Sequence, residues 1–296
     1  MSIINLPKIL VIVGPTSSGK TSLSIKLAKR FNGEVVSADS RQVYKGMDFG
    51  TGKVTKKEMQ SIKHYLLDVV SPKTQFSAAK FVKLADKAIK EIIKKGKLPI
   101  ICGGTGFWVE ALLYGLNETV APDWQLRKKL EKLSAEELLN KLSRISPERA
   151  RNIDPHNKRR LIRALEIALL TKKPVLPVQK NLRYDALQLG IVKDREVLNK
   201  LIRQRLLARI KQGMIKEVAG LHKNGVSWQK LDDFGLEYRY VSRFLRGLLT
   251  KEQMLEQLEI ASRHYAKRQM TWFKREKNIH WLKDLNKASK LVENWL

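Results

Sequence analysis

The chain has 296 residues, 43% of them hydrophobic, which is enough to form the core of one large domain or two smaller ones. Its 58 lysines and arginines exceed its 29 acidic residues, and the net charge of +29 favours a polyanionic partner, nucleic acid before an anionic membrane. A single cysteine, Cys102, excludes an internal disulfide. There is no signal-peptide pattern and no run of about 18 apolar residues that could span a membrane. We therefore expect a cytoplasmic protein.

A phosphate-binding loop is predicted near the N-terminus, directly after the apolar run at residues 9–13. Backbone N–H groups of such a loop and of the next helix surround phosphate oxygens, a lysine adds a cation, and a threonine hydroxyl can ligate Mg²⁺. The loop residues are Gly14, Pro15, Thr16, Ser17, Ser18, Gly19, Lys20 and Thr21. Such a loop most often binds a nucleotide, and the pattern by itself leaves open whose phosphates it holds.

A candidate catalytic carboxylate follows the second predicted strand, at residues 34–38. The strand ends in Asp39, Ser40, Arg41 and Gln42. Because the carboxyl ends of parallel strands border the crevice in which such folds bind ligands, Asp39 is expected beside the phosphate loop. A turn cap or a water-mediated contact with Mg²⁺ is the alternative role for this side chain. The glycine-rich residues 50–53 do not qualify as a second phosphate loop, because no strand precedes them.

The strand predicted at 98–102 ends differently from its counterpart in nucleotide hydrolases. It follows a strand at 64–70 and an amphipathic helix at 77–95. The helix has an apolar stripe that comprises Phe81, Leu84, Ala85, Ala88 and Ile92. The strand opens into Gly103, Gly104 and Thr105, whereas a P-loop ATPase or GTPase carries an aspartate at that place. The glycines predict a close approach of a ligand to the backbone, and Thr105 offers a hydroxyl.

Helical, basic character replaces the strand pattern from about residue 118 to residue 185. Helix starts are predicted at Ser134, which opens a capping box, at Ser146 and near Asp154. In the third helix Arg159 and Arg163 are four residues apart and form a basic ridge. The ridge is either a nucleic-acid contact or a solvated helix face, and the net charge favours the first.

The rest of the chain completes the sheet. Strands are predicted at 185–192 and 279–282, and helices at 194–212, 216–223 and 251–274. We therefore expect an α/β fold, a P-loop NTPase-like parallel sheet flanked by helices, built from residues 1–117 and 186–296. Residues 118–185 are expected to form an inserted, all-helical domain.

Six blocks, in chain order, together resemble the tRNA dimethylallyltransferases, also called isopentenyl-tRNA transferases. They are residues 14–21, residues 37–40, residues 44–51, residues 103–105, residues 160–166 and residues 266–272. The resemblance implies transfer of a dimethylallyl group from dimethylallyl diphosphate to the exocyclic N6 of the adenosine 3′-adjacent to the anticodon in tRNA, with release of pyrophosphate. It also implies that the helical insertion contacts the anticodon stem-loop.

The resemblance assigns roles to the residues found above. Residues 16–21 hold the diphosphate with Mg²⁺ at Thr21, Asp39 accepts the proton of the amine as general base, and Thr105 helps to position the reacting groups. The positions that match the family's tRNA contacts are Asp39, Ser40, Arg41, Gln42, Thr105, Arg127, Arg159, Arg160, Leu161, Ile162 and Arg163. A monomer is the default expectation.

One stretch departs from the family pattern. Asp232 stands where the family has an arginine, and two residues are inserted between Gly235 and Tyr238. We therefore expect Arg239 or Arg268 to supply the charge that this arginine gives to the pyrophosphate.

Two other functions stay open on the residues alone. A P-loop kinase of a nucleotide or small metabolite would use the same loop, although the Gly-Gly-Thr strand end and the net charge argue against it. A non-catalytic RNA-binding protein would have no physical need of both Lys20 and Asp39.

Overall fold

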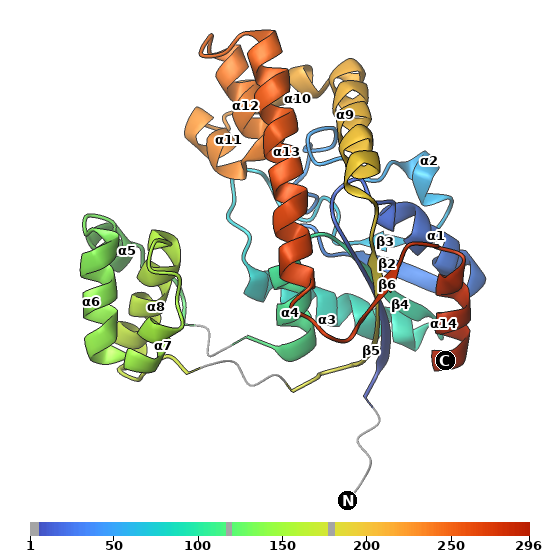
Figure 1. Ribbon diagram of the computed structural model, residues 1–296, viewed down its shortest axis with the longest axis horizontal. Coiled ribbons are helices and arrows are strands. Elements are labelled where there is room, and N and C mark those ends of the chain that lie inside the picture. Colours follow the sequence, from blue (N-terminus) through green and yellow to red (C-terminus); the bar gives the residue numbers. More distant parts are fainter. Residues whose placement is uncertain (1–5, 117–119, 177–180) are drawn as a thin grey trace, which may run out of the picture. The chain divides into compact units, whose positions relative to one another are not determined.

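The computed structural model describes residues 6–116, 120–176 and 181–296, which form two compact units (Figure 1). One unit combines Met1–Leu113 with Leu182–Leu296, and the other is Tyr114–Asn181. The second unit overlaps the expected insertion but ends before residue 185, because Asp185 already pairs with β1 in the sheet. The expected start of the insertion, at 118, and the loop at Pro177 lie outside the described residues.

Six parallel strands form one sheet in the order β3-β2-β4-β1-β5-β6. The strand β1 lies between β4 and β5, and Val11 pairs with Ile101 on one side and Gln188 on the other. Such a strand is covered on both faces, which explains its continuous apolar run. The strands are β1 (Lys8–Val13), β2 (Gly33–Ser37), β3 (His64–Tyr65), β4 (Leu98–Cys102), β5 (Asp185–Ile191) and β6 (Ile279–Leu282).

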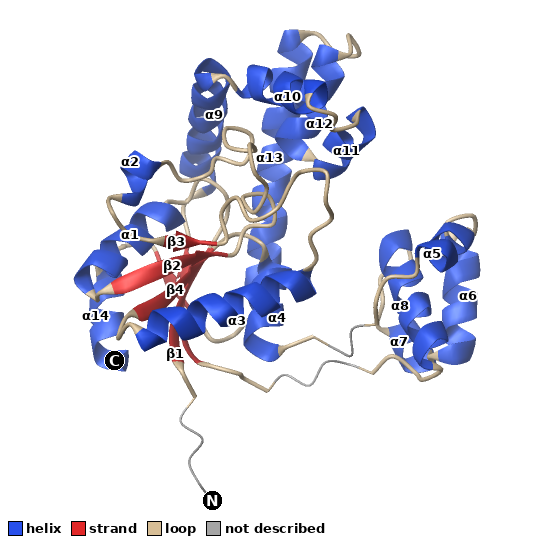
Figure 2. Cartoon of the chain, turned by 180° about the vertical axis from the view of Figure 1, so that it is seen from behind, coloured by secondary structure: helices blue, strands red, loops and turns tan. Residues whose placement is uncertain are grey.

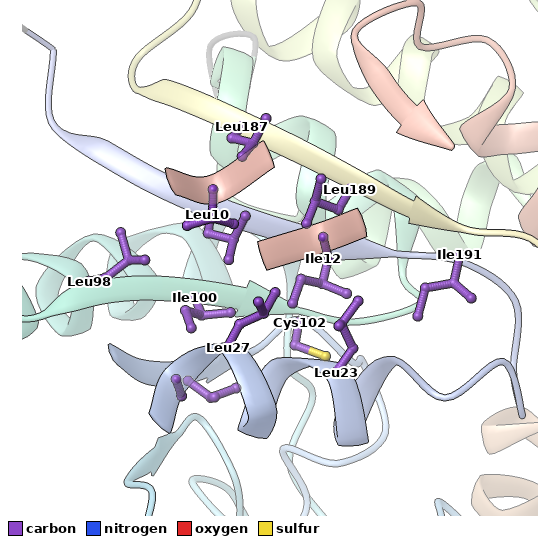
Figure 3. Packing of buried hydrophobic residues seen from close by; sticks show 14 of the residues in the cluster. Leu10, Ile12, Leu23, Leu27, Leu98, Ile100, Cys102, Leu187, Leu189 and Ile191 are labelled. Carbon is purple, nitrogen blue, oxygen red and sulfur yellow. The ribbon is translucent and has the colours of Figure 1, made fainter. Parts of the chain in front are cut away.

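Helices cover both faces of the sheet (Figure 2). On one face α1 (Lys20–Arg30) and α14 (Lys287–Trp295) pack their apolar side chains onto β1, β4 and β5. Figure 3 shows Leu23 and Leu27 of α1 against Ile12 and Ile100. The helices α3 (Ala78–Lys94) and α4 (Gly106–Tyr114) lie on the other face (Figures 1 and 2). The short α2 (Lys56–Met59) has no buried residue.

A group of helices follows β5 (Figure 1). The helices α11 and α13 each pack on α12, and α9 packs on α13. The expected segments 194–212, 216–223, 251–274 and 279–282 are confirmed to within two residues at each end, whereas α11, α12 and α14 were not predicted. The helices of this group are α9 (Arg195–Gln212), α10 (Met214–Lys223), α11 (Trp228–Phe234), α12 (Leu236–Leu245) and α13 (Lys251–Phe273).

The smaller unit contains only helices among its described residues. They are α5 (Trp124–Leu130), α6 (Ala135–Ile145), α7 (Pro147–Arg151) and α8 (Lys158–Thr171). The predicted capping box is present, since the Ser134 hydroxyl and the Glu137 carboxylate each accept the other residue's backbone N–H. The third helix start, predicted for the stretch from Asp154 to Asn157, is confirmed, because the side chain of Asn157 caps the helix.

Two other expectations are wrong in detail. The strand expected at 64–70 stops at Tyr65, because Leu66 and Asp68 adopt positive φ angles of 62° and 55° that an extended strand does not allow. In α3, Leu84 is 37% exposed, and Ile89 is buried in the apolar stripe instead. Across the described ranges, no helix is both long enough and apolar enough to cross a membrane.

Candidate active site

A cavity of about 730 Å³ lies where the phosphate loop meets α9, α12 and α13. Its volume is in the range that binds a small-molecule ligand. Its walls include residues 16–22, residues 39–42, and residues 50–52 with Val54, together with side chains of the three helices. All of these residues belong to the larger unit.

The phosphate loop has the backbone that its glycines allow. Gly14 has a φ of 145°, and a side chain there would meet the carbonyl oxygen of Ile191 at 2.9 Å. Gly19, at φ 98°, is the residue from which α1 begins. The Ser18 hydroxyl is buried and has no hydrogen-bond partner among the described residues. Residues 16–21 line the cavity, whereas Gly14 and Pro15 shape the turn behind it.

Lys20 is the cation of this loop. Its ammonium donates a hydrogen bond to the Pro15 carbonyl oxygen at 2.7 Å. Burial lowers the pKa of Lys20 to about 8, and the positive charge of Arg205 acts in the same direction. Cys102 and Asp39 oppose this shift. The pKa of the Cys102 thiol is raised, mainly by its burial.

Asp39 and Thr105 lie on neighbouring loops at the ends of β2 and β4. One Asp39 oxygen accepts the backbone N–H of Arg41 at 2.9 Å, and the half-buried carboxylate lines the cavity. The Thr105 hydroxyl accepts the N–H of Ser40 at 2.9 Å, so it braces the loop of Asp39. Thr105 itself is not among the residues that line the cavity.

The glycines after β4 leave room for neighbouring protein, and Gly103 and Gly104 also line the cavity, so the expected close approach of a ligand to their backbone stays a prediction. A side chain at Gly103 would overlap the backbone of Ala38, and one at Gly104 would overlap the amide of Gln269. The Gln269 side chain connects two loops: its oxygen accepts the N–H of Thr16 at 2.8 Å, and its nitrogen donates to the Gly104 carbonyl at 2.9 Å. The sequence did not indicate that Gln269, in α13, would connect these two loops.

Arg205, in α9, lines the cavity together with Lys20, Arg41 and Arg209, and the sequence analysis missed it as a site residue. Its guanidinium lies 3.5 Å from the Thr16 hydroxyl and donates to the Gly52 carbonyl at 3.0 Å. Burial, followed by the nearby charge of Arg209, lowers the pKa of Arg205 to about 10. The expectation for Arg239 or Arg268 is therefore wrong. Arg239 donates to the Asp232 carbonyl at 3.1 Å, Arg268 is exposed, and neither lines the cavity.

His64 also lines the cavity. Its Nδ1 lies 2.9 Å from the Ile62 carbonyl oxygen, and its buried Nε2 has no partner among the described residues. Burial lowers the pKa of His64 below its ordinary value, although the hydrogen bond to Ile62 opposes the shift.

In the smaller unit, Arg127 and Arg163, two of the arginines expected to contact RNA, bind a buried carboxylate. Arg127 donates two hydrogen bonds to Glu166, at 2.8 and 2.7 Å, and Arg163 pairs with the same carboxylate. Burial raises the pKa of Glu166, but hydrogen bonds from Arg127 and Arg163 outweigh it, and the pKa is lowered overall. Arg159 and Arg160 are exposed.

Leu161 and Ile162 are 0% and 6% exposed and belong to the apolar core of the smaller unit. Their side chains face the interior, so the expectation that they contact RNA is wrong for the side chains. Ser40, Arg41 and Gln42 all line the cavity of the larger unit.

The fold and the site define a class of protein. A parallel sheet whose first strand leads into a glycine-rich phosphate loop, with a lysine and an arginine beside it, is a P-loop α/β protein built to bind a phosphorylated ligand. The sequence profile of the IPP transferase family matches residues 42–276. The chain belongs to the IPP transferase family.

Individual relatives are similar over nearly the whole chain. A tRNA dimethylallyltransferase of Acetivibrio thermocellus is 42% identical over 302 residues, which cover 98% of this chain and 96% of that protein. One from Bacillus cytotoxicus is 43% identical over 296 residues, which cover 97% and 93%.

Solved structures agree with these relatives. The tRNA delta(2)-isopentenylpyrophosphate transferase of Staphylococcus epidermidis superposes with a TM-score of 0.71 at 41% identity, and the match covers 97% of this chain and 98% of that one. A eukaryotic dimethylallyltransferase acting on tRNA gives a TM-score of 0.76 at 26% identity, over 93% and 73% of the two chains.

Proposed function

We propose that this protein transfers a dimethylallyl group from dimethylallyl diphosphate to the exocyclic N6 of an adenosine in tRNA and releases pyrophosphate. The observation that carries the proposal is that Lys20, Arg205 and Asp39 line one cavity. Two cations suit a diphosphate, and a carboxylate suits an acceptor that must lose a proton. The names of the relatives support the same reaction.

The diphosphate would bind at residues 16–21 with Lys20 and Arg205 beside it. As the bond between the allylic carbon and the diphosphate oxygen breaks, negative charge grows on the leaving pyrophosphate, and these cations stabilise it. Among the described residues, no cluster of three or more His, Cys, Asp or Glu side chains could hold a metal ion. Mg²⁺ needs no such cluster, because it binds through few protein ligands and the phosphates of a substrate, so Thr21 would hold it and the ion would neutralise phosphate charge.

The acceptor nitrogen forms the new bond. The lone pair of N6 attacks the allylic carbon, the carbon–oxygen bond breaks with its electron pair on the pyrophosphate, and Asp39 takes one N–H proton from the nitrogen. Thr105 positions this step indirectly, because it holds the N–H of Ser40 next to Asp39.

The proposed acceptor is the adenosine 3′-adjacent to the anticodon of the tRNA. An adenine must leave its stack to reach the half-buried carboxylate of Asp39, and the net charge of +29 supplies attraction to the tRNA backbone. The exposed Arg159 and Arg160 of the smaller unit are the proposed phosphate contacts in the anticodon stem-loop. A monomer is proposed as the working form.

The test incubates the protein with unmodified tRNA, dimethylallyl diphosphate and Mg²⁺ and then weighs the nucleosides. We expect a gain of one prenyl group on adenosine, and a loss of at least about a hundredfold in rate for Asp39→Asn. Asp284→Asn is the matched control. Like Asp39, Asp284 accepts a backbone N–H, that of Asn286 at 2.9 Å, but it does not line the cavity. Phosphate transfer from ATP with no prenyl gain would establish a kinase instead.

A further inference from the structure

The loop at residues 47–53 is held from one side by a single carboxylate. Glu217, in α10, accepts hydrogen bonds from three consecutive backbone N–H groups: those of Asp48 and Phe49 at 2.7 Å and that of Gly50 at 3.0 Å. A carboxylate that accepts several N–H bonds fixes a backbone strongly, since each of these hydrogen bonds is charge-assisted.

Tyr238, in α12, holds Glu217 in turn. Its hydroxyl donates to the Glu217 carboxylate at 2.8 Å, and its ring fills the space beside Gly50. A side chain at Gly50 would lie 2.5 Å from the ring of Tyr238, so only glycine fits there. Burial and then the charge of Glu217 raise the pKa of Tyr238 well above its ordinary value, which keeps the hydroxyl a donor.

The opposite side of the same loop faces α9. The Gly50 carbonyl accepts a hydrogen bond from Arg209 at 3.2 Å, and the Gly52 carbonyl accepts one from Arg205 at 3.0 Å. Arg209 is also paired with Glu237 at 2.7 Å. The N–H groups of residues 48–50 therefore donate to Glu217, and two carbonyl groups of the loop accept from arginines. The loop positions arginines and does not serve as a second phosphate loop.

We infer that Glu217 is a positioning residue for the diphosphate donor, acting through this loop on the guanidinium of Arg205. This inference rests on the proposed function. An arginine has many rotamers, and holding it at the phosphate loop before the ligand arrives removes an entropic cost from binding. The Gly52 carbonyl fixes Arg205 next to Thr16, and Glu217 with Tyr238 fixes the loop that carries this carbonyl.

The first test is Glu217→Gln, which keeps the shape but removes the charge and turns one acceptor into a donor. We expect the KM for dimethylallyl diphosphate and the Kd for pyrophosphate with Mg²⁺ to rise about tenfold, while the KM for tRNA changes less than about twofold. Glu259→Gln is the matched control, because that carboxylate is 8% exposed and paired with Arg203 and Arg263 but does not line the cavity. An unchanged pyrophosphate Kd in folded Glu217→Gln would overturn the inference.

The second test repeats the change in an Arg205→Ala background. If Glu217 acts through Arg205, the double variant should bind pyrophosphate within about twofold of Arg205→Ala alone. A full further tenfold loss would mean that Glu217 acts independently of Arg205, and a lower melting temperature with no change in pyrophosphate Kd would mean a role in folding only. Either result would contradict the inference.

Tyr238→Phe covers the case in which Glu217→Gln does not fold. It removes only the hydroxyl that donates to Glu217, and we expect the pyrophosphate Kd to rise about threefold. An unchanged Kd in this variant counts against the inference. The tRNA assay and calorimetry with pyrophosphate together separate the two proposals. A wild-type protein that prenylates no tRNA defeats the proposed function. An active wild type, with normal pyrophosphate binding in both variants, defeats only the role of Glu217.

Discussion

Lys20 must carry a charge in a site that disfavours charge. Burial lowers its pKa to about 8, whereas an exposed lysine titrates at 10.5, so the ammonium of the free protein begins to lose its proton in mildly alkaline solution. A bound diphosphate favours the charged form. Ligand affinity and proton affinity at this residue are therefore linked.

Pyrophosphate binding should weaken as the pH rises above about 8, approaching a tenfold increase in Kd per pH unit. Calorimetry between about pH 7 and pH 9.5 measures this, and Lys20→Arg, which stays charged, should flatten the profile. A flat profile for the wild type would contradict the lowered pKa.

The same shift affects folding in a defined direction. The native pKa of Lys20 lies below that of the unfolded chain, so between about 8 and 10.5 the unfolded state binds more protons. The contribution of this residue to the free energy of unfolding therefore increases as the pH rises through that window.

At the scale of elements, one carboxylate joins two helices of the smaller unit. Glu166 in α8 binds Arg127 of α5, its neighbour Arg163 and the N–H of Asp123 at 2.8 Å. Arg163 also donates to the Val120 carbonyl at 3.0 Å. A fully buried carboxylate with these partners determines how α5 sits on α8.

Glu166→Ala should lower the free energy of unfolding of the smaller unit by about 3–5 kcal/mol, because it leaves two arginines without their shared partner. Urea unfolding followed by the fluorescence of Trp124 in α5 measures the change. Glu148→Ala, at an exposed position of α7, is the control and should stay within about 0.5 kcal/mol of the wild type. Equal stability of the two variants would mean that the ion pairs do not hold α5.

At the scale of the whole molecule, the excess of positive charge is the main attraction for a tRNA. Charge spread along the chain acts on the phosphate backbone without regard to sequence, whereas the proposed reaction places one base and one donor in the cavity. Affinity for the tRNA and the KM for the donor should therefore respond differently to salt.

Between about 50 and about 200 mM salt the Kd for tRNA should rise roughly a hundredfold or more. Arg160→Ala should reduce the slope of log Kd against log salt concentration by about 1 without changing the KM for the donor. Lys90→Ala, at an exposed position of α3, is the charge-matched control. Equal slopes for both variants would assign Arg160 to a solvated helix face.

Local patterns were sufficient for much of the fold and part of the site. The phosphate loop, the helix α1 and the strands β1, β2 and β4 lie close to where hydrophobic periodicity and glycine spacing predicted them. These features depend on neighbours within a few residues. The strand at His64 was overestimated because Leu66 and Asp68 leave extended geometry.

The amino-acid sequence by itself determined the sheet, the phosphate loop and the placement of Asp39 at a strand end, because strand, turn and helix preferences are local. Only the tertiary structure decided which cation meets the loop. Arg205 reaches Thr16 across a large separation in sequence, and the loop that carries its partner Gly52 is held at Gly50 by Glu217 from another helix. Contacts of this kind follow from how α9 and α10 pack, and the two arginines that the sequence had favoured, Arg239 and Arg268, do not line the cavity.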